Sequence, residues 1–269
     1  MEHFDVAQIR KFSPFVIQMV GNRRQGKSYM VNHLCRELSD QFDLIISFMG
    51  SKHCNPELGT YLEGQGYGDF LFHMWDNDFM ERLETQQMEL MEAGRKRRVL
   101  ILVDDITMDF ADREKLAHLC CRGRHFYVSV AMLSVSYSSF HKSCRRSADF
   151  IFLFSMGCQS DRDLMATEFA HKKASCMFYV DQITAKDHTC AVLNLNQKVQ
   201  KVYWYKAPLL TETTPAECSP DPGKNPRPRT RGRTRAGGGA DERHRVQSPL
   251  RQRIEIPGAA PGPASSDGC

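Results

Sequence analysis

Short apolar runs alternate along the chain with segments whose apolar residues recur every three or four positions. The short runs predict strands at residues 15–20, 44–48, 70–72, 99–103, 126–133, 149–154, 190–195 and 202–205. The helical spacing predicts helices at residues 30–38, 79–91, 113–121 and 161–169. Alternating strands and helices indicate an α/β fold, in which a mainly parallel sheet carries helices on both faces and ligands bind at the carboxyl ends of the strands.

Three segments carry weaker signals than the rest of the chain. Residues 126–133 show the alternating pattern of a strand rather than a continuous apolar run. Residues 50–68 are rich in glycine, which predicts a loop. Gly94 is placed to end the helix predicted at residues 79–91.

The first predicted strand leads into a phosphate-binding motif. Residues 21–28 fit the pattern GxxxxGK followed by Ser or Thr, and a predicted helix comes next. In this arrangement backbone N–H groups bind a phosphate, Lys27 bridges the β- and γ-phosphates, and Ser28 binds Mg²⁺. Arg23 and Arg24 either contact phosphate or point into solvent, which is the commoner state of a loop side chain. The predicted ATP site comprises Gly21, Asn22, Arg23, Arg24, Gln25, Gly26, Lys27 and Ser28.

A second motif follows the apolar run 99–103, which ends in two aspartates. This pattern is typical of the Walker B strand. There Asp104 holds Mg²⁺ through its water shell, and Asp105 orients or deprotonates the attacking water. Strand ends also carry aspartates that are merely solvated, and Asp105 is one methylene shorter than the usual Glu. The phosphate-binding motif in the same chain favours the Walker B interpretation.

Composition divides the chain into two parts. It is 41% hydrophobic and 25% charged, as in an ordinary soluble globular protein. From Pro220 onward Pro, Gly, Arg, Ser and Thr dominate and no periodicity remains. We therefore expect a folded ATPase domain at 1–208 and a disordered tail at 209–269. The tail holds 10 basic and 7 acidic residues, so most of the formal net charge of +4 belongs to it.

Cysteine spacing and hydropathy bear on the compartment. The ten cysteines include no CxxC pair, which favours reduced intracellular thiols over disulfides or a zinc site. No stretch approaches 18 consecutive apolar residues, and the amino terminus is charged before any apolar run. We expect a protein that is neither secreted nor inserted into a membrane.

Further segments extend these motifs into a family resemblance. Gly123-Arg124-His125 leads into the strand Val128-Ser129-Val130, and Arg145 shortly precedes Ala148-Asp149-Phe150-Ile151. Together with the two motifs above, residues 12–205 resemble the DNA-packaging ATPases of large DNA viruses. These form the poxvirus-type branch of the FtsK/HerA superfamily, which also occurs in Polinton elements. The resemblance implies a RecA/ASCE-like P-loop NTPase fold.

The resemblance also implies an activity and its partners. Such a protein is an ATP-driven motor that works as a homo-oligomeric ring and pumps double-stranded DNA into a capsid. Capsid proteins are then further partners, and the place of work is the site of virus assembly in the host cell or the nucleus. Arg124 and Arg145 become candidates for arginine fingers that reach the γ-phosphate of a neighbouring subunit. For each, the alternative is a solvated side chain or an ion pair within the fold.

One position departs from the family pattern. Members carry a glutamine in a stretch like Leu-Thr-Gln-Ser-Tyr, where it senses the γ-phosphate and helps to align water. The corresponding residues 133–137 read Leu-Ser-Val-Ser-Tyr, with Val135 at the glutamine position. Either Ser134 or Ser136 substitutes through a bridging water, or hydrolysis is impaired.

The predicted tail repeats arginine at every second position from 227 to 235. This spacing suits a disordered arm that neutralises DNA phosphates without reading sequence, a nuclear-import signal or a solubilising tail. For the whole chain, a cellular HerA-like translocase and a slow-hydrolysing nucleotide-binding assembly protein remain alternatives to the packaging motor. A small-molecule kinase fits poorly, since such kinases lack the Asp-Asp strand end followed by a sensor strand.

Overall fold

The computed structural model describes residues 1–208 without 51–54, 105, 170–172 and 198–200, and without the side chains of 173–176. Asp105 and the predicted tail at 209–269 lie outside the described residues. Within them the chain forms an eight-stranded sheet with the strand order β3-β2-β4-β5-β1-β6-β7-β8. The strands are β1 (Val16–Val20), β2 (Leu44–Met49), β3 (Leu71–Phe72), β4 (Val99–Asp104), β5 (Val128–Ser134), β6 (Phe150–Leu153), β7 (Cys190–Asn194) and β8 (Val202–Tyr205).

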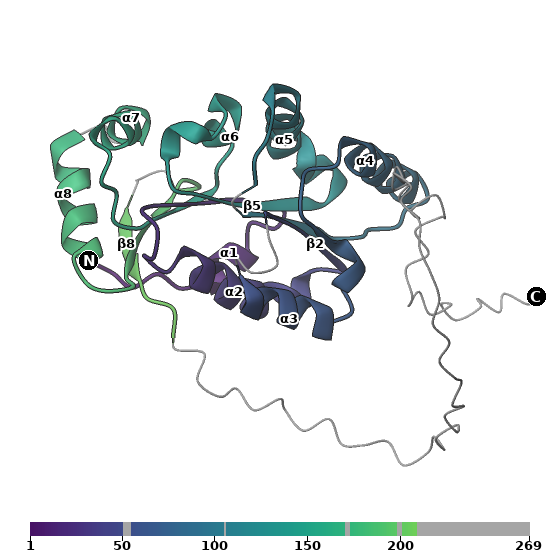
Figure 1. Ribbon diagram of the computed structural model, residues 1–269, viewed down its shortest axis with the longest axis horizontal. Helices are drawn as coiled ribbons and strands as arrows, with labels where there is room; N and C mark the ends of the chain where they lie inside the picture. Colours follow the sequence, from purple (N-terminus) through teal and green to yellow (C-terminus); the bar gives the residue numbers. More distant parts are fainter. Residues whose placement is uncertain (51–54, 105, 170–172, 198–200, 209–269) are drawn as a thin grey trace, which may run out of the picture. The chain divides into compact units, whose positions relative to one another are not determined.

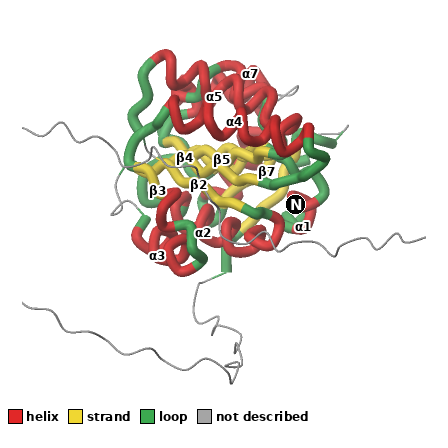
Figure 2. Tube along the Cα trace, turned by 90° about the vertical axis from the view of Figure 1, so that its right-hand side faces the viewer, coloured by secondary structure: helices red, strands yellow, loops and turns green. Residues whose placement is uncertain are grey.

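The sheet is parallel from β3 to β6, and β7 and β8 complete it as antiparallel strands. Helices cover both of its faces (Figures 1 and 2). One face carries α1 (Ala7–Arg10), α2 (Lys27–Leu38) and α3 (Pro56–Gly64). The other carries α4 (Asn77–Glu92), α5 (Phe110–Arg122), α6 (Lys142–Arg146) and α7 (Gln159–Phe169), and α8 (Lys173–Thr184) follows α7 (Figure 1). The predicted α/β fold with a mainly parallel sheet is confirmed.

The central strands β1 and β4 are buried along their whole length. All five residues of β1 and all six of β4 are buried. Helices on both faces exclude water from such strands, so they read as continuous apolar runs. The alternation predicted for residues 126–133 was wrong, because β5 starts at Val128 and is buried through Leu133. Its polar Ser129 tolerates burial because its Oγ accepts a hydrogen bond from the N–H of Phe15 (3.2 Å).

Helix α3 occupies part of the segment predicted as a glycine-rich loop. Asn55 caps its amino end by accepting a hydrogen bond from the N–H of Leu58 (3.3 Å), and Pro56 is its first residue. Leu58 and Leu62, one turn apart, are fully buried. Capping and burial together stabilise a helix that its glycines disfavour. The short helix α6 and helix α8 were also not predicted.

Phe4, from the segment before α1, ties the amino terminus to the antiparallel end of the sheet. Its backbone N–H donates to the carbonyl of Trp204 (2.9 Å). The ring is fully buried and meets those of Phe150, Phe152 and Tyr203 edge-on, with centroids 5.9, 5.7 and 5.8 Å away. Each such pair contributes about 0.5–1.5 kcal/mol beyond its burial. Among the described helices, none has both the length and the apolar character needed to cross a bilayer.

Candidate active site

The phosphate-binding loop lies between β1 and the amino end of α2, on the side of the sheet formed by the carboxyl ends of the parallel strands. We call this side the carboxyl edge. The N–H of Gly21 donates to the carbonyl of Ser134 at the end of β5 (3.3 Å). The N–H of Asn22 donates to the carbonyl of Ser155 just after β6 (2.8 Å). Because β1 pairs with both of these strands, the loop is anchored on either side of its own strand.

Two glycines of the loop meet requirements that other residues fulfil poorly. A Cβ at Gly21 would lie 2.5 Å from Cβ of Phe154, far inside contact distance. Gly26 has a φ of 96°, in the left-handed region that favours glycine, and it forms the N-cap of α2. As a glycine it has no side chain with which to cap α2, so an anion is the natural partner of the first N–H groups of the helix.

Lys27 closes the loop from the first turn of α2. Its Nζ donates to the carbonyls of Gly21 (2.6 Å) and Asn22 (2.8 Å), so the ammonium lies where phosphate oxygens can replace these acceptors. Ser28 follows, half-buried, and its carbonyl accepts a hydrogen bond from Nδ2 of Asn55 (3.1 Å). Asn55 thereby fastens the start of α3 to the start of α2.

The remaining loop side chains differ in exposure. Oδ1 of Asn22 accepts a hydrogen bond from the N–H of Gly157 (3.2 Å), which joins the loop to the segment after β6. Gln25 is half-buried, whereas Arg23 and Arg24 are exposed. Phosphate contact by Arg23 or Arg24 stays a prediction.

Asp104 is the last residue of β4 and lies at the same edge of the sheet. In the parallel register it stands beside Met49 of β2 and Leu133 of β5. The residue is 7% exposed, and its carbonyl accepts a hydrogen bond from the N–H of Gly50 (3.3 Å). The structure thus places Asp104, the predicted Walker B carboxylate, at the edge that carries the loop, with only β5 between β4 and β1.

The end of β5, between these two strands, carries hydroxyl groups where the resemblance led us to expect a glutamine. Val135 is 46% exposed. The hydroxyl oxygens of Ser134 and Ser139 lie 2.6 Å apart, and those of Ser136 and Ser138 lie 2.9 Å apart. This serine cluster comprises Ser134, Ser136, Ser138 and Ser139. Its substitution for the missing glutamine stays a prediction.

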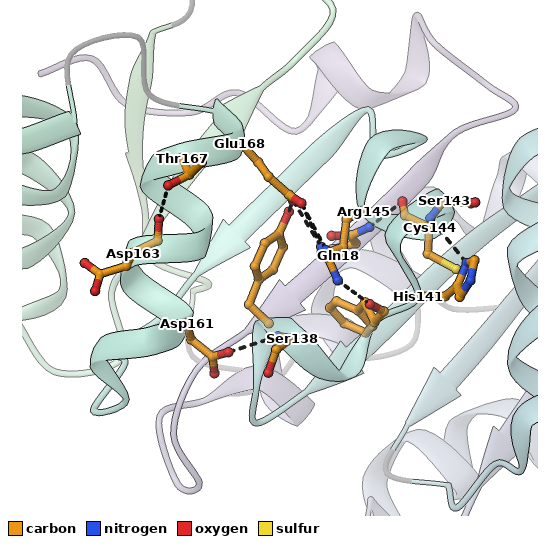
Figure 3. Close-up of polar contacts among 12 residues, drawn as sticks. Gln18, Ser138, His141, Ser143, Cys144, Arg145, Asp161, Asp163, Thr167 and Glu168 are labelled. Carbon is orange, nitrogen blue, oxygen red and sulfur yellow. Dashed lines mark hydrogen bonds and ion pairs between the residues drawn. The ribbon is translucent and has the colours of Figure 1, made fainter.

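Asp161, in the first turn of α7, supports the serine cluster from the side. Its Oδ1 accepts a hydrogen bond from the N–H of Ser138 (2.9 Å), as Figure 3 shows. The residue is only 2% exposed. Burial by itself raises the pKa of Asp161, but hydrogen bonds from Ser136 and Ser138 outweigh it and hold the pKa below its ordinary value. The sequence showed Asp161 only as a helix start and did not reveal this contact.

Arg145, on α6, lies in an ion pair within the fold. Its Nη2 is 3.0 Å from Oε1 of Glu168 on α7, and its Nη1 donates to the carbonyl of Phe140 (2.7 Å) (Figure 3). The hydroxyl of Tyr137 donates to the same carboxylate (2.8 Å). The side chains of Arg145 and Glu168 are 11% and 16% exposed. A finger role for Arg145 stays a prediction, and it requires this ion pair to open.

Arg124 lies at the opposite edge, formed by the amino ends of the parallel strands, in the 3-10 turn η3 (Gly123–Phe126) that precedes β5. Its side chain is exposed and lines a pocket of about 270 Å³ with Arg146 and Asp149. Burial raises the pKa of Asp149, against the hydrogen bond from the N–H of Val16 (2.8 Å) and the charge of Arg124. A strand of this length spans roughly 20 Å, so Arg124 cannot reach a nucleotide on its own loop.

Comparison with known families decides the identity of the chain. A family model described as "Poxvirus A32 protein" matches residues 1–193, which include the loop, Asp104 and both arginines. The chain belongs to this family. The resemblance to the poxvirus-type ATPases is confirmed.

Solved structures share the fold of this A32-family chain. The DNA-packaging ATPase B204 from Sulfolobus turreted icosahedral virus has a TM-score of 0.51 and 14% identity, covering 71% of this chain and 97% of its own. ATPases 2 and 3 of EssC from Geobacillus thermodenitrificans have a TM-score of 0.52 and 14% identity, covering 71% of this chain and 39% of that protein. At these identities the likeness shows the fold, and it confirms the predicted P-loop NTPase architecture. No curated protein sequence matches the chain.

The A32-family chain offers oxygen donors of the kind that Mg²⁺ prefers. The hydroxyl of Ser28 and the carboxylate of Asp104 belong to elements that meet at the carboxyl edge. Hard oxygen ligands from one or two protein groups, with phosphate oxygens and water completing the shell, suit this cation. The donor set therefore fits Mg²⁺ bound together with a triphosphate.

Proposed function

We propose that this A32-family protein is an ATPase that couples hydrolysis to the translocation of double-stranded DNA and packages a viral genome into a capsid. The observation that carries the proposal is the placement of the phosphate-binding loop and Asp104 at one sheet edge, on either side of β5. The B204 protein, whose fold is similar, is itself described as a DNA-packaging ATPase.

The residues divide the work on ATP between them. The N–H groups at the start of α2 hold the β-phosphate, and Lys27 holds β- and γ-oxygens after leaving the carbonyls that it now contacts. Ser28 and Asp104 would hold Mg²⁺, which neutralises charge on the phosphates when it is bound. Asp105, which lies outside the described residues, is proposed to orient or deprotonate the attacking water.

The serine cluster is proposed to complete the site at the γ-phosphate. It adjoins the loop directly, because the carbonyl of Ser134 accepts a hydrogen bond from the N–H of Gly21. Ser136 then orients a water in place of the missing glutamine, and Asp161 fixes the hydroxyls around it. Preoriented donors of this kind stabilise charge that develops in the transition state.

A homo-oligomeric ring is proposed because Arg124 lies at the edge away from the loop. An exposed arginine at this edge can complete the site of a neighbouring subunit, as arginine fingers supplied in trans do. Between the two candidates, Arg124 fits this role better than Arg145, which the ion pair with Glu168 holds. The same proposal includes capsid proteins as partners. It places the protein at the site of virus assembly or in the nucleus.

ATP turnover measured with and without double-stranded DNA tests the proposal. A translocating motor is expected to hydrolyse ATP faster when DNA is present. A slow ATP turnover that does not change when DNA is added would instead favour the nucleotide-binding assembly protein, for which the exposed Val135 is the supporting observation. DNA stimulation without any association with capsid proteins would favour a HerA-like translocase.

Substitutions at the end of β5 test the role of the serine cluster. If Ser136 already orients the water, Ser136→Ala is expected to lower turnover by about tenfold for each 1.4 kcal/mol of transition-state stabilisation that is lost. Val135→Gln should then leave the rate flat or lower it, because the new amide displaces the water. A rise in turnover with Val135→Gln, together with a silent Ser136→Ala, would show instead that the cluster does not replace the glutamine.

Removal of residues 209–269 tests the proposed DNA arm. The cut belongs after Pro208, because Ala207 is buried and the carbonyl of Pro208 accepts a hydrogen bond from the hydroxyl of Tyr29. The shortened protein is expected to keep its ATPase activity and to bind duplex DNA more weakly at low salt. Its logarithmic salt slope should become shallower by about 0.9 for each phosphate contact that is lost. Equal slopes for both chains would mean that the arm does not touch phosphates.

A further inference from the structure

His188 lies beside the phosphate-binding loop although the two segments are far apart in the sequence. A Cβ built on Gly26 would lie 3.4 Å from Nδ1 of His188 and 3.9 Å from its Cβ. The ring of Phe154 is likewise 3.9 Å from that point. His188 itself is exposed. It therefore adjoins the start of α2 while its side chain remains accessible to a ligand on the loop.

The position of His188 follows from the direction of β7. Strand β7 runs antiparallel to β6, so it begins at the edge where β6 ends, and Ala191 pairs with Leu153. The turn from α8 into β7 is thus brought to the carboxyl edge. Two hydrogen bonds from Thr189 hold the turn. Its N–H donates to the carbonyl of Lys186 (3.2 Å), and its hydroxyl donates to the carbonyl of Asp187 (3.4 Å).

The backbone of His188 adopts a left-handed conformation, with a φ of 56°. Such a conformation is uncommon outside glycine, and it costs of order 1–3 kcal/mol unless the surroundings enforce it. Residues held in this way gather at ligand-binding sites. Here the conformation coincides with the approach of the imidazole to the loop.

The strand order indicates which end of a nucleotide His188 would meet. Asp104 and the serine cluster lie on the β5 and β4 side of β1, so the γ-phosphate has to face that side for hydrolysis. A nucleotide whose phosphates follow the loop then leads its nucleoside toward β6 and β7. His188 lies on this second side.

We propose that His188 is the platform on which the nucleobase of the bound nucleotide stacks. The inference rests on the proposed nucleotide site and adds to it the group that holds the base. An aromatic ring stacks on any base through its π-face, so this contact gives affinity for the nucleoside without strong selection among bases. The phosphate contacts of the loop do not depend on it.

The test compares the binding of ATP and of inorganic tripolyphosphate, each with Mg²⁺, by calorimetry. His188→Asn removes the ring but suits the left-handed backbone, since asparagine tolerates positive φ. It is expected to weaken ATP binding about tenfold, within the range for loss of one base–aromatic stack, and to leave tripolyphosphate binding unchanged. His188→Phe keeps an aromatic face, although positive φ disfavours a bulky residue, so its thermal unfolding is measured as well; the folded variant should retain most of the ATP affinity. His118→Asn, on the exposed side of α5, is the matched control and should bind both ligands as the native chain does.

The outcomes distinguish failure of the base platform from failure of the nucleotide site. Native-like ATP affinity of His188→Asn would overturn the platform and leave the nucleotide site intact. An equal loss for ATP and tripolyphosphate would also overturn it, because His188 would then act on the phosphates. A native chain that binds neither ligand would instead remove the nucleotide site itself and this inference with it.

Discussion

Lys27→Ala is expected to weaken ATP binding by about two to four orders of magnitude, because charged hydrogen bonds to the β- and γ-phosphates contribute roughly 1.5–3 kcal/mol each. The fold should survive the substitution. The loop remains anchored by the hydrogen bonds from Gly21 to Ser134 and from Asn22 to Ser155, which do not involve the lysine side chain. Calorimetric titration with ATP and thermal unfolding measure the two effects separately.

Two further variants make this result specific to the charge. Lys27→Met keeps the alkyl stem and should lose ATP as Lys27→Ala does. Lys11→Ala, at an exposed lysine before β1 and so at the other edge of the sheet, should bind ATP normally. Native-like ATP affinity in a folded Lys27→Ala protein would refute the phosphate-binding role of the loop.

Arg124→Ala should lower ATP turnover by about three or more orders of magnitude, the range over which arginine fingers act, while ATP still binds. Binding is spared because Arg124 lies at the edge opposite its own loop. Arg122→Ala, at an exposed arginine two positions away on α5, is the matched control and should hydrolyse ATP normally.

Mixing of subunits tests whether Arg124 acts on a neighbour. Arg124→Ala subunits keep an intact loop, and Lys27→Ala subunits keep an intact arginine. A mixture of the two should recover turnover that neither has alone. Absence of recovery in mixed rings that form normally would show that Arg124 does not act in trans.

Arg145→Ala should behave differently from Arg124→Ala. It leaves the mostly buried carboxylate of Glu168 without its arginine, and removal of one partner of such a pair costs about 3–5 kcal/mol of folding stability. The expected signature is a lower melting temperature. A stable Arg145→Ala protein that binds ATP but does not hydrolyse it would return the finger role to Arg145.

Local patterns were enough to predict most of the sheet and the phosphate-binding loop. The buried strands β1 and β4 are continuous apolar runs, because helices cover both of their faces. The loop is a contiguous motif whose glycines, lysine and serine act through their own backbone and side chains. The sequence therefore located Lys27, Ser28 and Asp104 at the ends of the correct elements.

Short elements and long-range contacts were beyond the reach of such patterns. Helix α3 contains two glycines, yet Leu58 and Leu62 bury one of its faces, and that burial exists only in the folded chain. The partner of Arg145 is equally invisible in the sequence. Tertiary packing brings Glu168 of α7 to Arg145 and forms this ion pair, whereas the finger role of Arg145 stays a prediction.

By itself, the sequence determined that a P-loop motif follows one buried strand and that an aspartate, the predicted Walker B residue, ends another, because both signals are contiguous. Only the tertiary structure decided what surrounds them. Parallel pairing of β4 with β5 brings Asp104 to the loop's edge and puts Arg124 at the opposite edge, and the antiparallel direction of β7 brings His188 next to Gly26. These neighbours depend on how strands pair across the sheet, and pairing between distant segments leaves no local pattern in a single chain.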